Sequence, residues 1–118
     1  SALGALTKRL LEEEGMFEAV MQNVKSQTPT ADLLVNQIRT GSLDAVVVYR
    51  ANTPYVRGEL DIVPIDRPAA RAVQPYAVGK NTLYPQLMAR LMVAICSKSS
   101  QEKFESIGFH WLAGETHP

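Results

Sequence analysis

One stretch of the chain, residues 43–50, reads Leu43-Asp44-Ala45-Val46-Val47-Val48-Tyr49-Arg50. A continuous apolar run rich in β-branched residues predicts a strand that is buried on both faces. The run ends in Tyr49, and open α/β sheets bind their ligands outside the carboxyl ends of their strands. We therefore expect Tyr49 to lie at the edge of a ligand cleft.

The segment that leads into this run, residues 28–41, has the pattern of a short amphipathic helix. The first amides of a helix have no partner within it, and the positive end of the helix dipole lies there. The predicted start, Thr28-Pro29-Thr30-Ala31, is therefore a candidate anion site that the Tyr49 hydroxyl could reach. Spacing alone leaves a second interpretation open, in which Tyr49 is a half-buried structural residue and Thr28 or Thr30 is a plain cap.

The rest of the chain alternates helical and strand-like patterns. Further strands are predicted over residues 59–65 and 72–78, and the alternation of helices with strands predicts an α/β layered domain. The helix that begins at Pro85 is apolar over much of its circumference, so we expect other segments to pack against it on more than one side. Ser99-Ser100-Gln101-Glu102 predicts a capping box for the last helix, which should end at Gly108.

Composition argues against several classes of function. The charges of twelve basic and twelve acidic residues cancel, so the chain has no net positive charge that would attract nucleic acid or an anionic membrane. The two histidines, His110 and His117, lie in the tail without carboxylates at metal-ligand spacing, and Cys96 is the one cysteine. We therefore expect neither an enzyme nor a cofactor. The chain begins at Ser1 without a methionine, so the absence of a signal peptide does not decide the compartment.

The order of these segments resembles a known family. Residues 30–53, which include Val48-Tyr49-Arg50-Ala51-Asn52-Thr53, resemble the second lobe of periplasmic solute-binding proteins of the molybdate/tungstate type, where a "VYRSDA"-like sequence follows the strand. Residues 73–78 resemble the "YPVAV" strand that returns to the first lobe, and residues 87–109 resemble the closing helices. Residues 4–17 resemble the "GrYAreaLeklGlw" helix near the start of that lobe.

The resemblance implies a bilobal type 2 periplasmic-binding-protein fold that captures an oxyanion, molybdate or tungstate, and delivers it to a membrane ABC permease. It implies a periplasmic or extracellular location, with or without a lipid anchor. Residues 1–73 would be the lobe-two α/β segment, and residues 74–118 would be the crossover strand and the helices that pack on lobe one. The ligand contacts carried over by position are the Tyr49 hydroxyl, the amide at Ala31 with its neighbour Thr30, and an amide near Leu3 or Gly4.

Two features depart from the family pattern. Ala5, Leu6 and Thr7 stand where an aromatic residue is expected, and the residues of the first lobe are absent. We therefore expect a carboxyl-terminal fragment that binds an anion only weakly. The apolar face of residues 87–95, from Leu87 to Ile95, should then find cover in a homodimer or in a swapped helix pair.

Two other classes of function are kept as alternatives. A ligand-sensing domain of a transcriptional regulator uses the same type of bilobal fold, and the sequence upstream of these residues would distinguish it. An interaction module with a degenerate pocket is the second alternative. It would show no thermal stabilisation by molybdate, tungstate or sulfate.

Overall fold

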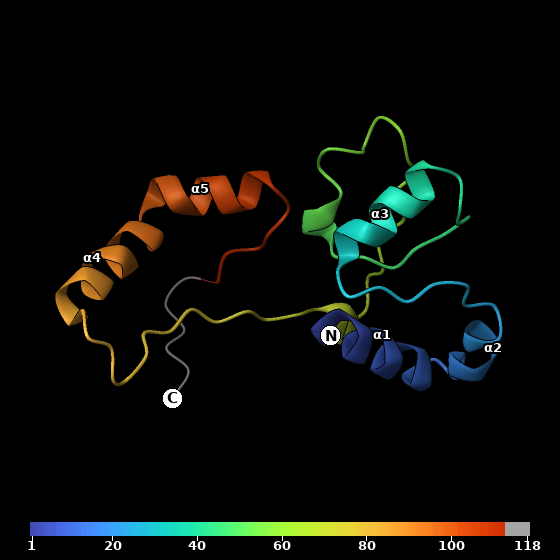
Figure 1. Cartoon of the computed structure of the whole chain (residues 1–118), viewed down its shortest axis with the longest axis horizontal. Coiled ribbons are helices and arrows are strands. Elements are labelled where there is room, and N and C mark those ends of the chain that lie inside the picture. The colour runs from blue at the N-terminus through green and yellow to red at the C-terminus, as the bar shows by residue number, and fades with distance from the viewer. Residues whose placement is uncertain (113–118) are drawn as a thin grey trace. The chain divides into compact units, whose positions relative to one another are not determined.

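The computed structural model describes residues 1–112, and over these residues the chain forms helices joined by extended segments (Figure 1). The helices lie where the apolar periodicity predicts them, with ends that differ by a few residues. The α-helices are α1 (Ala2–Glu13), α2 (Phe17–Met21), α3 (Ala31–Arg39), α4 (Pro85–Ile95) and α5 (Lys98–Ser106), and the short 3₁₀ helices are η1 (Arg50–Asn52) and η2 (Pro68–Ala70).

The predicted α/β class is wrong, because no β-strand forms within residues 1–112. Residues 43–49 have no regular structure, and Val47 remains 42% exposed instead of being buried on both faces. The predicted strands at residues 59–65 and 72–78 are likewise unpaired. A strand is held by hydrogen bonds to a neighbouring strand, and an apolar run cannot supply that neighbour by itself. The α/β second lobe expected from the resemblance is therefore not observed.

The chain divides into two compact units, Ser1–Val73 and Gln74–Pro118, hereafter unit 1 and unit 2. Unit 1 contains α1, α2, α3 and both 3₁₀ helices, and unit 2 contains α4 and α5. The roles predicted for the segments 1–73 and 74–118, as parts of two lobes, remain a prediction.

Three helices end at a glycine, and one of these is Gly108, the predicted end of the last helix. Gly15, Gly41 and Gly108 have φ values of 67°, 74° and 100°, a left-handed conformation that other residues rarely adopt. After each glycine the chain closes a Schellman motif. In α5, for example, the Phe109 amide donates to the Phe104 carbonyl over 3.1 Å and the Gly108 amide donates to the Glu105 carbonyl over 3.1 Å.

The starts of the helices differ more from the sequence-based expectation. The α5 cap is Ser97, whose Oγ accepts from the Ser100 amide over 3.2 Å, and not Ser99 of the predicted capping box. Ser100 occupies the third helical position, so a glutamate or glutamine is not available there to complete the box. Pro29 precedes the α3 cap, Thr30, so that proline lies outside the helix instead of in its first turn.

Unit 1 contains the buried apolar side chains of the described chain. They come from separated segments, because Leu10 lies on α1, Val35 on α3, Val56 in the loop after η1 and Ala69 on η2. Contacts join α1 to α2 and η2, and α3 to η1. The four buried side chains belong to the same compact unit as the elements that carry the candidate site.

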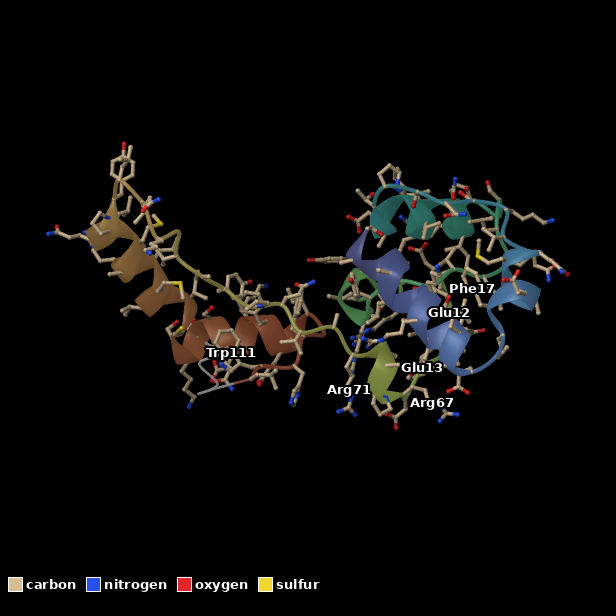
Figure 2. All side chains as sticks on the ribbon, turned by 90° about the horizontal axis from the view of Figure 1, so that it is seen from below. Glu12, Glu13, Phe17, Arg67, Arg71 and Trp111 are labelled. Carbon is tan, nitrogen blue, oxygen red and sulfur yellow. The ribbon has the colours of Figure 1, made fainter. Side chains whose placement is uncertain are left out.

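Ion pairs and hydrogen bonds also cross unit 1. Arg39 at the end of α3 donates to both carboxylate oxygens of Glu59, over 2.7 and 3.2 Å. The hydrogen bond from the Arg39 guanidinium to Glu59, and then the charge of Glu59, raise the pKa of Arg39 above its ordinary value. Arg67 beside η2 donates to Glu14 at the end of α1 over 2.8 Å. Figure 2 shows Arg67 and Arg71 near η2, on the same side as Glu12 and Glu13 of α1.

Unit 2 is organised around the ring of Phe104 on α5. The rings of Tyr76, Phe109 and Trp111 lie 5.9, 5.5 and 5.5 Å from it, between ring centroids. Offset and edge-to-face contacts at these distances are favourable. The extended segment that carries Tyr76 and the residues after α5 are therefore both attached to one aromatic side chain. Among residues 1–112, no helix is long and apolar enough to span a membrane.

Candidate ligand site at the start of α3

The first turn of α3 lacks a side-chain cap. Thr30, the cap residue, has an extended backbone (φ −131°, ψ 150°), and its side chain makes no capping hydrogen bond. The Thr30 carbonyl instead accepts from the Thr28 hydroxyl over 2.7 Å. Amides in the first turn have no partner inside the helix, so the amides from Ala31 onward remain available to an external acceptor.

The short helix η1 packs against α3, and Tyr49 directly precedes η1. Tyr49 is half-buried, is the residue just before η1, and has an extended backbone (φ −71°, ψ 149°). At the other end of η1, the Asn52 side chain donates to Asp32 Oδ1 in the first turn of α3 over 3.2 Å. The Thr53 hydroxyl closes η1 by donating to the Arg50 carbonyl over 2.7 Å. Figure 1 shows η1 beside α3.

The charges around the first turn of α3 are mixed. Asp32 is exposed and carries a carboxylate at the positive end of the helix dipole, which it stabilises. Arg50 on η1 is also exposed and forms no ion pair within residues 1–112. The Asn52 side-chain oxygen is buried without a hydrogen-bond partner in the same part of the chain. The region therefore offers donors from the backbone and from Arg50, next to one negative charge.

The structure brings some of the predicted site residues together and separates others by element. Thr30 and Ala31 lie at the start of α3, and Tyr49 is the residue before η1, which packs on α3. Leu3 and Gly4 lie in the first turn of α1, which packs on α2 and η2. The Gly4 amide already donates to Ser1 Oγ over 3.1 Å, so it is not a free donor.

The contact between Asp32 and Asn52 was not predicted from the sequence. The two residues are 20 positions apart, so no helical or strand periodicity relates them. The only available signal for Asn52 was a polar residue in the loop that follows the apolar run. Its partner on α3 depends on tertiary packing, which the sequence pattern does not specify.

A shallow hollow between α1 and α2 is a second cluster of polar and aromatic side chains. It is lined by Glu12, Gly15, Phe17 and Glu18, and the Lys8 ammonium lies 5.5 Å from the centre of the Phe17 ring. Figure 2 shows Phe17 and Glu12 near the junction of the two helices. Among residues 1–112, no three histidine, cysteine or acidic residues are arranged to hold a metal ion. His117 lies outside the described residues.

The uncapped first turn of α3 and the exposed Arg50 on η1 offer hydrogen-bond donors to a ligand. Residues 1–110 match the family described as bacterial extracellular solute-binding protein, and the chain therefore belongs to that family. Neither the comparison with curated proteins nor the comparison with solved structures gave a match.

Family membership confirms the broad part of the functional prediction. The chain is a solute-binding protein of an extracellular transport family, whose general partners are a small-molecule ligand and an ABC permease. Membership favours binding over catalysis and supports transport over the transcriptional-regulator alternative. The family description does not name molybdate, tungstate or any other solute.

Proposed function

We propose that this protein captures a small oxyanion, such as molybdate or tungstate, for import by an ABC permease, and that the anion binds at the start of α3. The proposed contacts are the amides that begin at Ala31, with Thr30 at the cap, and the Tyr49 hydroxyl. Leu3 and Gly4, in the first turn of α1, remain further candidates. The proposed location is periplasmic or extracellular, with or without a lipid anchor.

The observation that carries the proposal is the uncapped first turn of α3 with η1 packed beside it. Backbone amides at a helix start bind anions because several partial positive charges converge there. Arg50, exposed and free of ion pairs within residues 1–112, adds a full positive charge next to Tyr49. Together these groups supply several hydrogen-bond donors, which suits a ligand made of acceptor oxygens.

We expect the affinity to be low. Each hydrogen bond to a charged ligand contributes about 1.5–3 kcal/mol, while association itself costs at least about 4 kcal/mol. Three or four such bonds therefore leave only a few kcal/mol, which corresponds to a dissociation constant of about 1 mM. The Asp32 carboxylate lowers the affinity further by repelling the anion.

Replacing Tyr49 tests the proposal. Tyr49→Phe removes one hydroxyl donor, so binding should weaken by about 1.5–3 kcal/mol, or roughly ten-fold to a hundred-fold. Calorimetric titration of the whole chain with molybdate, tungstate and sulfate in large excess measures this change.

Tyr55→Phe is the matched control, since Tyr55 is 89% exposed in the same loop region and should leave the affinity unchanged. If wild type, Tyr49→Phe and Tyr55→Phe bind the anions equally, Tyr49 does not contact the ligand. If none of the three anions binds the wild type at any concentration, the proposal of an oxyanion ligand is wrong. The alternative of an interaction module with a degenerate pocket then gains support.

A further inference from the structure

Asn52 joins η1 to the first turn of α3 by a side-chain hydrogen bond. Its nitrogen, Nδ2, donates to Asp32 Oδ1 over 3.2 Å, across 20 positions of the sequence. Its side-chain oxygen, Oδ1, is buried and has no hydrogen-bond partner within residues 1–112. The side-chain amide therefore has one favourable orientation, because turning it over would bring Oδ1 against the Asp32 carboxylate, where two acceptors would face each other.

The buried oxygen makes Asn52 a poor choice for stability alone. A buried acceptor without a partner destabilises the folded chain by at least as much as one exposed hydrogen bond stabilises it. A leucine has a similar size and would fill the same space without this penalty. The donation to Asp32 is the property that a leucine would lose, so the role of Asn52 should depend on Asp32.

Asp32 is a potential competitor of any anion at the start of α3. It lies in the first turn of a helix whose cap residue makes no side-chain hydrogen bond. A carboxylate in a first turn is attracted to the free amides, because partial positive charges converge there. The proposed oxyanion would use the same donors. In the structure, however, the Asp32 carboxylate accepts from Asn52, and among residues 1–112 it accepts from no backbone amide.

We propose that Asn52 is a positioning residue for the anion site, because its Nδ2 group holds the Asp32 carboxylate away from the free amides of α3. This inference rests on the proposed function and adds an internal competitor, Asp32, to that site. Asn52 acts through Asp32 and does not contact the ligand. With Asn52 present, the amides from Ala31 onward stay open to an external oxyanion. Without it, the carboxylate turns toward those amides and occupies part of the site.

Asn52→Leu removes the donor and keeps the size of the side chain. Titration of the whole chain with tungstate should show an affinity roughly two-fold to five-fold lower, the size of effect that a charged group has at a helix start. In the Asp32→Asn background, Asn52→Leu should change the affinity little, because no carboxylate remains to compete. A purely structural role of Asn52 would lower the affinity by the same factor in both backgrounds.

The ligand-free chain gives a measurement that does not depend on the proposed function. In ¹⁵N NMR spectra without tungstate, Asn52→Leu should shift the amide resonances in the first turn of α3. In the Asp32→Asn background the same substitution should move them little. Asn23→Leu is the matched control, since Asn23 also lies in unit 1 and its side chain donates to the Ala19 carbonyl, away from α3.

The two measurements separate the inference from the proposed function. If the wild type binds no tungstate but Asn52→Leu shifts the first-turn resonances as expected, the proposed function is wrong and the control of Asp32 by Asn52 stands. Equal losses of affinity in the wild-type and Asp32→Asn backgrounds would overturn the proposal. So would first-turn resonances that respond to Asn52→Leu no more than to Asn23→Leu.

Discussion

Units 1 and 2 both contain short helices but are stabilised differently. Unit 1 has buried apolar residues on four separated segments, and ion pairs such as Arg39–Glu59 connect those segments. Unit 2 has one aromatic cluster around Phe104 and an exposed α4. The comparison shows that unit 1 buries apolar side chains from separated segments, whereas the described part of unit 2 depends mainly on one aromatic cluster.

The largest expected effect comes from the core of unit 1. Leu10 is only 7% exposed, so Leu10→Ala should cost about 3 kcal/mol through lost burial and the cavity that remains. Native-state hydrogen exchange should show this loss in the amides of α1 and α3, and little change in α4 and α5. Leu33→Ala, at a residue that is 46% exposed on α3, should cost less than about 1 kcal/mol. An equal cost for the two substitutions would contradict the described core of unit 1.

Unit 2 should depend on Phe104. Phe104→Ala removes three aromatic contacts worth about 0.5–1.5 kcal/mol each, so the unit should lose about 2 kcal/mol of stability. Trp111 is the only tryptophan of the chain, and its near-ultraviolet circular dichroism should decrease with the loss of the cluster. Phe17→Ala, a change in unit 1, should leave that signal intact. If Phe104→Ala keeps the near-ultraviolet circular dichroism of the wild type, the aromatic cluster does not stabilise unit 2.

A smaller effect should distinguish the ligand site of unit 1 from general charge effects. Asp32→Asn removes the carboxylate from the first turn of α3, and the repulsion of about 1 kcal/mol that it lifts should strengthen oxyanion binding roughly five-fold. Asp61→Asn, at another exposed residue of unit 1, should change the affinity little. Titration at low ionic strength would measure both. Identical behaviour of the two variants would mean that the anion binds away from α3.

The helix ends were predictable from the sequence because they depend on local chemistry. Gly15, Gly41 and Gly108 end three helices since glycine alone adopts positive φ without strain. The start of α5 was placed two residues late, because Ser97 and Ser99 are both acceptable caps and the sequence does not rank them.

The strands were not predictable in the same way. Residues 43–49 have the composition of a buried strand, but a strand exists only when another segment pairs with it, and that pairing is non-local. The candidate site likewise combines a feature set by the local sequence with features set by non-local packing. A helix start near Thr30 follows from the local sequence, whereas the missing side-chain cap of Thr30 and the contact of Asn52 with Asp32 appear only in the folded structure.

Oxyanion binding at the start of α3 is tested most directly by ¹⁵N NMR, which records the backbone amide resonances of the whole chain during titration with tungstate. If the oxyanion binds at the start of α3, the amide resonances of Ala31 and its neighbours in the first turn should shift together with that of Arg50. Those of α4 and α5 should stay in place. Shifts confined to other residues, or no shift at millimolar tungstate, would contradict the proposed site.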